Sequence, residues 1–597
     1  MLSKISRFSK STFSKPSFAI FLLIFASLGS YLVLNSFAAS NPNIYIAQNA
    51  TGTASGADCA NAEPASFFNV STNWGANSNQ IGPGTTVHLC GSINISLTAQ
   101  GNGASSNPIN LQWESGARLS EAVCPSSGCV NISNRSYITL DGGSNGVIED
   151  TANGTGLANK VSASVGILAA DCSNCTVKNL TVQNMYLHTL LSDTSIDHTQ
   201  NNAIKFSGSN ITIANNTIHD VGWALYQDQR TCTDTNVTIN GNNIYNTDHS
   251  WALVANNCAG GSIGPYYFYG NHLHDWSNWD TTTDAYHHDG IHCYTSDSGT
   301  GAAAHYNGLY IYDNRFDGQT DLSGSPTGDN MTADIFLEGG SGAGATPCSD
   351  STSPIYLFNN VASGSEPINN GVFGVFSGNP LIYNNTLIAS TTSSGVGYLT
   401  NSAVEGETFE NNVVTTASQV INTSPSFFAA SQPDYNLYAN GGSNSFVCKG
   451  SFFNFSQFAS WKVCMSADSH SDIAASASLN PDGSPQLGSP AITAGTNLTN
   501  LCSGQPNPGL GALCSDINGN ARPISGAWDI GAYQFSGSSG GGPVVGDLNN
   551  DGHVNVFDLS IFLSHWQQDG SSLPEEFNND NTVNIFDLSI LLSHYGS

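Results

Sequence analysis

Histidines and carboxylates concentrate in one central segment of the chain. Ten of the 15 histidines fall between residues 188 and 305, and the densest group runs Asp284-Ala-Tyr-His287-His288-Asp289-Gly-Ile-His292. Such residues bind transition metals or transfer protons. On an extended strand, however, His288 and His292 would lie about 13 Å apart at about 3.3 Å per residue, too far to share one ion. The spacing therefore favours acid–base chemistry over a zinc site.

Carboxylates that follow this segment are candidate partners for proton transfer. If Asp334 and Glu338 lie one strand spacing, about 4.8 Å, from His292, an acid and a base can act on one glycosidic bond. The bond would break by hydrolysis between two carboxylates, or by β-elimination with a histidine or tyrosine as base. The predicted catalytic residues are Asp334, Glu338, His292, Asp289 and His288.

Residues that suit a sugar substrate occur in the same region. Lys205 and Arg230 are candidates to neutralise a uronate carboxylate, and aromatic rings stack on sugar rings. The predicted substrate-binding residues are Lys205, Tyr226, Asp228, Arg230 and Tyr294, and the aromatic candidates are Trp223, Trp251, Trp276 and Trp279. The alternative for each single residue is that the polar side chains are only solvated and the aromatic rings pack under loops.

A second pattern, near the C-terminus, suits a hard cation. The segment 547–558 carries oxygen side chains at positions 1, 3, 5, 9 and 12 of a loop, with Gly552 at position 6 for the sharp turn. The backbone carbonyl of position 7 adds a further oxygen. The predicted calcium ligands are Asp547, Asn549, Asp551, His553, Asn555 and Asp558.

A second copy of this loop follows at 576–587. Its predicted calcium ligands are Glu576, Asn578, Asp580, Thr582, Asn584 and Asp587. Glu576 at position 1 and Asn581 at position 6 depart from the pattern, so weaker binding is expected. The segments 555–566 and 584–595 are identical at nine of twelve positions, and each should form a short helix.

A repeat between about residues 176 and 430 must position the central residues. The pattern apolar-x-apolar-x-x-Asn-x-apolar centres on Asn216, Asn242 and Asn314, with weaker copies at Asn271, Asn360, Asn385 and Asn412, at intervals of 26, 29, 43, 46, 25 and 27 residues. Short strands and turn asparagines at this period predict a stacked β-solenoid. Each turn asparagine should hydrogen-bond to those above and below it, and the long intervals should hold loops inserted on one face.

A second column of strands follows the asparagine turns. The residues expected to point inward are Ile204, Leu225, Leu253, Ile291, Ile335 and Phe373. Side-chain alternation then sends outward Lys205, Tyr226, His292 and Phe336, followed two residues later by Ser207, Asp228, Asn256, Tyr294 and Glu338. We predict that these outward residues form a polar and aromatic wall.

The N-terminus predicts export. Basic residues from Lys4 to Lys15 precede the apolar segment 18–34 and the small residues before Ser40, so a signal peptide is expected over 1–39, cleaved after Ala38 or Ala39. An uncleaved anchor is the alternative. All 14 cysteines follow this segment, which favours disulfides; neighbours group as 59/90, 124/129, 172/175, 232/258, 293/348, 448/464 and 502/514.

The net charge of the chain limits which classes of binding partner are expected. Fourteen Lys and Arg residues against 44 Asp and Glu residues give a net charge of −30. This charge repels nucleic acid and anionic membrane lipids, so neither is an expected partner. It also repels acidic sugars unless calcium bridges the two negative surfaces.

The repeat resembles the secreted right-handed parallel β-helix proteins that include pectate lyases and polygalacturonases. The closing motifs, which begin at Asp434, Gly488, Asp516 and Asp529, are similar to a tail on bacterial members, and 43–47 resembles their first strand. The resemblance spans residues 41–535 and implies an all-β fold. It implies no single reaction, because this scaffold hosts lyases, hydrolases, epimerases and adhesive proteins.

The duplicated loop-helix units resemble a dockerin, the module that docks enzymes onto cohesin domains. This resemblance implies bound Ca²⁺. It also implies that loop positions 10 and 11, here Val556-Phe557 and Ile585-Phe586, face the partner.

Four segments are therefore predicted: a signal peptide (1–39), a right-handed parallel β-helix with terminal caps (40–535), a Gly/Ser linker (536–545) and a small α-helical dockerin-like domain with two calcium loops (546–597). The predicted function is an extracellular, polysaccharide-degrading glycosidase or lyase, docked to a scaffold or cell surface through a cohesin-type partner, with no membrane contact after processing. The alternative is a non-catalytic β-helix adhesin or glycan-binding surface protein.

Overall fold

The computed structural model describes most of the chain between Pro42 and Tyr595. The described residues are 42–153, 163–185, 201–228, 234–254, 262–277, 288–294, 304–321, 331–338, 348–350, 352–363, 371–388, 396–400, 407–415, 419–422, 433–442, 444–448, 450–535, 546, 548, 554–568, 573–578 and 580–595. The predicted signal peptide and linker lie outside these ranges.

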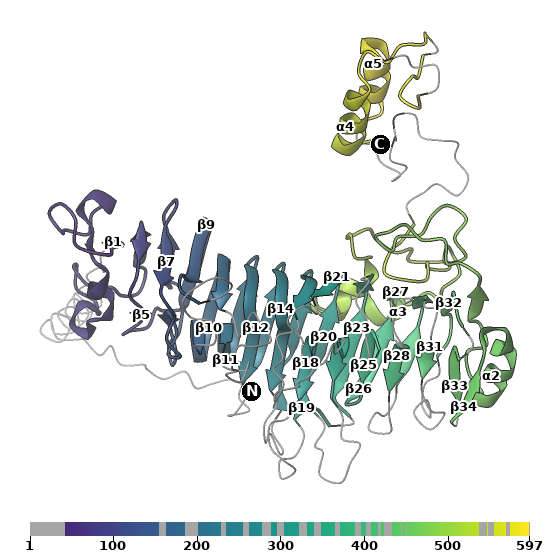
Figure 1. Cartoon of the computed structure of the whole chain (residues 1–597), viewed down its shortest axis with the longest axis horizontal. Helices are drawn as coiled ribbons and strands as arrows, with labels where there is room; N and C mark the ends of the chain where they lie inside the picture. The colour runs from purple at the N-terminus through teal and green to yellow at the C-terminus, as the bar shows by residue number, and fades with distance from the viewer. Residues whose placement is uncertain are drawn as a thin grey trace, which may run out of the picture.

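The body is a parallel β-helix with three strand faces, and Figure 1 shows its coils side by side along the long axis. Face 1 runs through β1 (Asn43–Ala47), β3 (Thr86–Cys90), β6 (Ile109–Trp113), β9 (Ile138–Asp150), β10 (Ser164–Met185), β11 (Asn201–Ala214), β13 (Thr235–Asn240), β16 (Tyr266–Tyr269), β20 (Leu309–Tyr312), β23 (Pro354–Phe358), β26 (Asn379–Tyr383) and β29 (Thr408–Glu410). All neighbours in this series pair in parallel, which confirms the predicted stacking of coils.

Face 2 begins after each asparagine turn. It runs through β4 (Ser92–Ile93), β7 (Arg118–Glu121), β9, β10, β12 (Thr217–Asp228), β14 (Asn243–Val254), β17 (His272–Ser277), β21 (Arg315–Asp321), β24 (Val361–Ala362), β27 (Thr386–Ile388), β30 (Val413–Thr415), β32 (Leu437–Ala439) and β35 (Asp472–Ala474). The longest strands continue around a corner and so belong to two faces.

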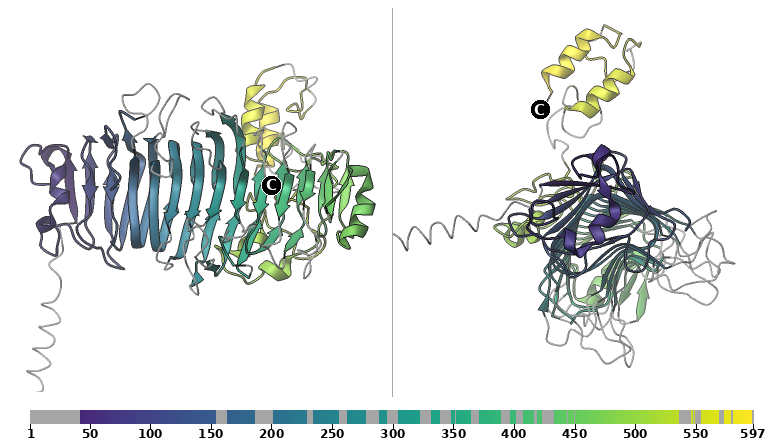
Figure 2. Two further views of the ribbon diagram at one scale, coloured as in Figure 1. Left: turned by 60° about the horizontal axis from the view of Figure 1, so that its bottom comes forward. Right: turned by 90° about the vertical axis from the view of Figure 1, so that its left-hand side faces the viewer.

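Face 3 carries the second strand column of the repeat. It runs through β5 (Leu97–Thr98), β8 (Val130–Asn131), β10, β11, β12, β14, β18 (Asp289–Tyr294), β22 (Ala333–Leu337), β25 (Phe373–Val375), β28 (Val396–Thr400), β31 (Gln419–Asn422) and β33 (Phe446–Cys448). Short additional strands are β2 (Glu63–Pro64), β34 (Ser451–Phe453) and the pair β15 (Ser262–Ile263) and β19 (His305–Tyr306). Figure 2 shows the same stack from two further directions.

A buried asparagine ladder joins faces 1 and 2. Each Nδ2 donates to the Oδ1 of the next member at 2.9–3.2 Å, through Asn216, Asn242, Asn271, Asn314, Asn360, Asn385, Asn412 and Asn436. The residue before each member has a left-handed backbone, as at Asn215 (φ 56°) and Asn384 (φ 51°), a conformation that asparagine tolerates. The predicted ladder is confirmed, and Asn436 extends it by one coil.

The interior is apolar and is closed by disulfides. Trp251 and Phe268 are buried and stack with their ring centroids 4.9 Å apart. Six of the seven predicted cysteine pairs form disulfides, namely 59/90, 124/129, 172/175, 293/348, 448/464 and 502/514. Cys232 and Cys258 lie outside the described residues.

Both ends of the coil stack are covered. Short 3-10 helices (Cys59–Asn61, Ala65–Asn69 and Ser71–Asn73) lie at the first coil, and α2 (Phe458–Met465) packs on the last, with a 3-10 turn at Phe455–Gln457 before it. The closing segment, with α3 (Thr499–Cys502) and a 3-10 helix at Leu510–Cys514, returns along face 1. There Arg522 donates to Asn359 Oδ1 at 2.8 Å, and Asn384 donates to the carbonyl of Asp529 at 3.0 Å.

The C-terminal unit holds the two predicted helices, α4 (Val556–Ser564) and α5 (Ile585–Ser593). Each starts with a capping box, in which the asparagine Asn555 or Asn584 exchanges hydrogen bonds with an aspartate three residues later. Val554, Phe562, Val583 and Leu591 form their shared core. Among the described residues, no helix has the length and apolar character that a bilayer crossing requires.

Candidate functional site

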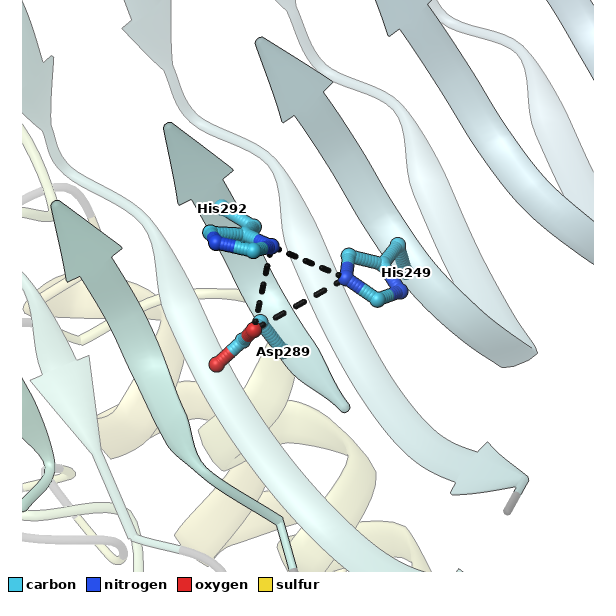
Figure 3. Close-up of side chains that lie close together, drawn as sticks. All are labelled: His249, Asp289 and His292. Atoms are coloured by element: carbon cyan, nitrogen blue, oxygen red, sulfur yellow. Dashed lines mark hydrogen bonds and ion pairs between the residues drawn. The ribbon is translucent and has the colours of Figure 1, made fainter. Parts of the chain in front are cut away.

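The central histidines and aspartates form a buried cluster where face 3 begins (Figure 3). His249 from β14 lies in register with Asp289 from β18 in the next coil, and His292 follows Asp289 by three residues. The His249 Nε2 atom lies 3.2 Å from His292 Nδ1. The Asp289 Oδ2 atom lies 3.7 Å from the former nitrogen and 3.5 Å from the latter. Three potential ligand atoms therefore face one another.

A glycine lies between Asp289 and His292 in β18. Ile291 points into the core, and Gly290 lies against the neighbouring strand β22. A Cβ atom at Gly290 would come within 2.4 Å of the backbone carbonyl of Asp334. Glycine is therefore required for the close approach of these two coils.

Asp248 orients two of the histidines. Its Oδ2 atom accepts a hydrogen bond from His249 Nδ1 at 2.7 Å, and its Oδ1 atom accepts one from His288 Nδ1 at 2.5 Å. Trp223 Nε1 donates to the same carboxylate at 3.3 Å. Three donors stabilise the ionised form of Asp248, and a proton on Nδ1 leaves the Nε2 lone pair of His249 directed at the cluster.

The second carboxylate of the cluster, Asp289, has fewer donors. Its Oδ1 atom accepts the Ala333 N–H at 3.1 Å, whereas its Oδ2 atom accepts no hydrogen bond from any described residue. Burial raises the pKa of Asp289 to about 7, and the nearby His292 and His288 offset only part of this shift. Asp289 thus has an oxygen available for a cation or a proton.

Outside this cluster lies the predicted polar and aromatic wall. Glu338, whose side chain is 42% exposed, places Oε2 3.8 Å from His292 Nε2. The His292 ring also contacts the ring of Tyr294 at a centroid distance of 4.8 Å. Lys205 Nζ lies 4.7 Å from the ring centroid of Tyr226, and Trp223 packs edge-on against the same ring at 5.2 Å. These contacts agree with the prediction that four side chains point outward from the coil, namely Lys205, Tyr226, His292 and Tyr294.

Asp334 is a buried residue of β22. It is 1% exposed, and its N–H donates to the carbonyl of the core residue Val372. In β22 it lies beside Gly290 of β18, and it precedes Ile335, whose side chain is part of the core. Asp334 was predicted as a catalytic residue together with Glu338; Asp334 is buried, whereas the Glu338 side chain is 42% exposed.

The predicted register of β14 is wrong by two residues. Leu225 pairs with Trp251 rather than with Leu253, and Tyr226 pairs with Ala252. Trp251 therefore points into the core, where Trp276 is also buried, and neither ring is available to a sugar. The side chain of Asp228, together with Arg230, Asn256 and Trp279, lies outside the described residues.

Sequence reasoning missed Asp248 and His249, although a signal for them exists. Leu225 follows the ladder residue Asn216 by nine residues, and Trp251 follows Asn242 by nine. This constant offset would have aligned His249 with Trp223 and brought it to the cluster. His288, a predicted catalytic residue, is instead the second histidine held by Asp248.

The second calcium loop brings acidic oxygens together. One carboxylate oxygen each from Glu576, Asp580 and Asp587 lies within 4.8 Å of the others, which fits a hard cation. The Asp587 carboxylate also accepts the N–H groups of Phe577 and Asn584, at 2.7 and 3.0 Å.

Other predicted ligands of this loop hold its backbone. The Asn584 side chain caps α5 through the Phe586 N–H and donates to the carbonyl of Thr582 at 2.7 Å, while Asn578 donates to Asp580 at 2.9 Å. Their amide oxygens accept the N–H groups of Asp580 and Phe586, just as the carboxylates of Glu576 and Asp587 accept N–H groups of the loop.

Only part of the first loop is described. Asp558 accepts the N–H groups of Leu548 and Asn555, both at 2.8 Å, as its counterpart Asp587 does in the second loop. Asp547, Asn549, Asp551 and His553 lie outside the described residues.

Comparisons with known proteins find similarity in solved structures alone. No protein-family model and no curated protein matches the chain. XylC in complex with xylose has a TM-score of 0.41 at 9% identity, covering 82% of this chain and 98% of that one. The GH136 lacto-N-biosidase from Eubacterium ramulus has a TM-score of 0.35 at 14% identity, covering 69% and 67%. Pectate lyase Pel9A has a TM-score of 0.31 at 14% identity, covering 84% and 97%.

Proposed function

We propose that this chain is a secreted, carbohydrate-active β-helix enzyme that cleaves a polysaccharide at the start of face 3. The single observation that carries the proposal is the convergence of His292, Asp289 and Glu338 with a histidine that Asp248 holds in one tautomer. Proton donors and acceptors in contact, partly buried and next to aromatic rings, suit cleavage of a glycosidic bond.

Each residue has a distinct part in the proposed reaction. Glu338 is the carboxylate exposed enough to meet a polymer, and His292 lies directly behind it. The partly exposed Tyr294 offers its ring to a sugar, while Lys205, which lies over the buried ring of Tyr226, supplies positive charge for an acidic one. Hydrolysis would use Glu338 as acid or base, whereas β-elimination would use His292 or Tyr294 as base.

The test is a polysaccharide panel with the full-length protein. Reducing ends report hydrolysis, and absorbance of unsaturated uronates reports elimination. Glu338→Gln should lower turnover at least about 100-fold, since positioned acid–base groups contribute roughly 10²–10⁴-fold. The matched control is Glu114→Gln, because Glu114 also lies beside a histidine, 2.6 Å from His88 Nδ1, but in a distant coil. Undiminished turnover in Glu338→Gln would contradict the assignment.

A non-catalytic adhesin is the second candidate. The ring of Tyr294, which is partly exposed on the wall, favours it. An adhesin would bind glycans through the same aromatic residues without product formation. Retained glycan binding with no product from any polysaccharide would replace the enzyme proposal by this one.

We further propose that the C-terminal unit is a calcium-dependent docking module for a cohesin-type domain. Val556, Phe557, Ile585 and Phe586 are 57%, 67%, 58% and 66% exposed. They are near-duplicates at the starts of two equivalent helices, and exposed apolar residues in such a pair suit a partner surface. The six disulfides support an extracellular location, where cohesin partners occur.

Binding to a panel of cohesin domains, with calcium and with chelator, tests the docking proposal. The double variant Phe557→Ala/Phe586→Ala should lose binding, since aromatic anchors dominate interface energies. Phe452→Ala is the matched control, because Phe452 is 58% exposed on the β-helix. Equal binding by both variants would show that these helix starts are not the docking surface.

A further inference from the structure

The separations within the His249, Asp289 and His292 cluster match the coordination sphere of one metal ion. The three donor atoms lie 3.2, 3.5 and 3.7 Å from one another. A tetrahedral ion with bonds of about 2.0–2.1 Å keeps its donors roughly 3.3–3.4 Å apart. An octahedral ion with bonds of the same length keeps adjacent donors at roughly 2.9–3.0 Å. The triangle is therefore closer to a tetrahedral site, in which the described residues fill three of the four positions.

The chemical identity of the three donor atoms also favours an ion that binds tetrahedrally. Two imidazole nitrogens and one carboxylate oxygen suit Zn²⁺, whereas Ca²⁺ and Mg²⁺ prefer oxygen alone. Zn²⁺ sites of this composition keep water or substrate at the fourth position. The set is buried, with His249, Asp289 and His292 exposed by 1%, 0% and 6%.

Carboxylates lie near the ring nitrogens of His249 and His292 that face away from the cluster. Asp248 accepts from His249 Nδ1, which leaves Nε2 of that ring unprotonated and facing the cluster. Glu338 lies near the opposite ring nitrogen, Nε2, of His292, whose Nδ1 atom faces the cluster. A carboxylate behind a ligating histidine is the usual arrangement at protein zinc sites.

The buried carboxylate oxygen at one corner of the triangle provides a second observation. Asp289 Oδ2 is fully buried and accepts no hydrogen bond from the described residues, although it points between two histidine nitrogens. A buried carboxylate oxygen without a donor is costly, and a bound cation would remove that cost.

We infer that His249, Asp289 and His292 bind one Zn²⁺-class ion, with an open fourth position for water or a substrate oxygen. The sequence analysis disfavoured zinc because His288 and His292 lie too far apart on one strand. The site avoids this limit by drawing His249 from the preceding coil, while His288 supports Asp248 instead. Metal binding at this site does not depend on which polysaccharide, if any, the protein cleaves, but a His292 that binds the ion could not be the base of an elimination, which leaves Tyr294 for that role.

The experiment uses the full-length protein, stripped with chelator and then kept in excess Ca²⁺ so that the C-terminal loops are filled. Calorimetric titration with Zn²⁺ should give one ion per chain. Co²⁺ in its place should give the intense visible absorption of a tetrahedral complex. No high-affinity Zn²⁺ binding, or a six-coordinate Co²⁺ spectrum, would overturn the inference.

Variants locate the ion. Asp289→Asn preserves the shape of the side chain and should weaken Zn²⁺ binding at least about 100-fold, and loss of the carboxylate behind His249 in Asp248→Asn should weaken it about 10–100-fold. His272→Ala is the matched control, because His272, His274 and Asp317 form a separate, partly exposed cluster on face 2. Loss of the ion in His272→Ala with retention in Asp289→Asn would also overturn the inference.

Two further readouts separate misfolding from metal loss, and metal binding from activity. Zn²⁺ should raise the unfolding temperature of the wild type but not that of Asp289→Asn, whose temperature without metal shows whether it folds. A shift of equal size in both proteins would count against the site. A protein that binds one Zn²⁺ but cleaves no polysaccharide would support the metal site and overturn the enzyme proposal.

Discussion

Replacing Asn314 by alanine should destabilise the coils around it by about 4 kcal/mol. The Asn314 side chain is fully buried in the middle of the ladder. Its Nδ2 atom donates to the Phe268 carbonyl at 2.9 Å and to Asn360 Oδ1 at 3.0 Å. Its Oδ1 atom accepts the backbone N–H and the Nδ2 of Asn271, at 3.0 and 3.1 Å.

The magnitude follows from what alanine leaves behind. Asn271 Nδ2 keeps its bond to the Ile239 carbonyl, and Asn360 Oδ1 keeps the Asn314 N–H. The Asn271 N–H, in contrast, loses its acceptor inside the protein, which costs about 1–3 kcal/mol. The other three lost bonds contribute about 1 kcal/mol each, partly offset by relaxation.

Amide hydrogen exchange on the full-length protein measures this effect locally. A stack of coils need not unfold in one step, so a single global free energy of unfolding would be ambiguous. A loss of about 4 kcal/mol corresponds to roughly a thousandfold faster exchange in the coils next to Asn314. Asn307→Ala is the control, because Asn307 is exposed in the same coil. Equal exchange in both variants would refute the view that the ladder stabilises the stack.

Three further predictions concern other parts of the chain. Burial raises the pKa of Asp150 from its ordinary 3.8 to about 6, so the folded state binds more protons than the unfolded state between these values. The stability of the coils around Asp150 should fall by roughly 3 kcal/mol as pH rises from about 4 to 6, and Asp150→Asn should remove that fall in local amide hydrogen exchange, corrected for the pH dependence of exchange in an unfolded chain; a pH profile shared with the wild type would contradict this. Calorimetry should show two Ca²⁺ per chain and circular dichroism a gain of helix, with one Ca²⁺ in Asp587→Ala; a C-terminal unit equally folded in chelator would speak against coupled binding. Gly290→Ala should push β22 away from β18, because its Cβ would lie 2.4 Å from the Asp334 carbonyl, and should weaken Zn²⁺ binding at the cluster. Gly166→Ala creates a similar clash, 2.7 Å from the Ala203 carbonyl in a distant coil, and should leave Zn²⁺ affinity unchanged; equal affinity in both variants would refute the steric argument.

The coil architecture was predictable because its signal is local. Each copy of the repeat contains its own strand, its left-handed residue and its ladder asparagine, so a window of eight residues identifies a coil edge. The ladder pairs from Asn216 to Asn412 follow from such short segments, whereas the disulfides, one of which joins residues 55 positions apart, were predicted from the order of the cysteines alone. In these places local preference and tertiary packing agree.

The candidate site was less predictable because it depends on register between coils. The offset from Asn216 to Leu225 and from Asn242 to Trp251 is nine residues, but Ile291 follows Asn271 by twenty. Inserted residues remove the fixed offset at the coil that carries Asp289 and His292. Alternation along a strand also does not predict exposure: Asp334 is 1% exposed, whereas the Glu338 side chain is 42% exposed.

The inserted residues and the register between coils, which make the site hard to predict from the sequence, also bring its residues together. An uninterrupted coil fixes His249 by its distance from Asn242, whereas the next coil carries an insertion before Asp289 and can present a different residue type at the same height. Parallel stacking then places residues about forty positions apart in the sequence within about one strand spacing of each other. His292 adds a third side chain, because its Nδ1 atom lies 3.5 Å from Asp289 Oδ2 in the same strand. Convergence of three donors from two coils therefore combines one regular coil, which carries β14, with one interrupted coil, which carries β18.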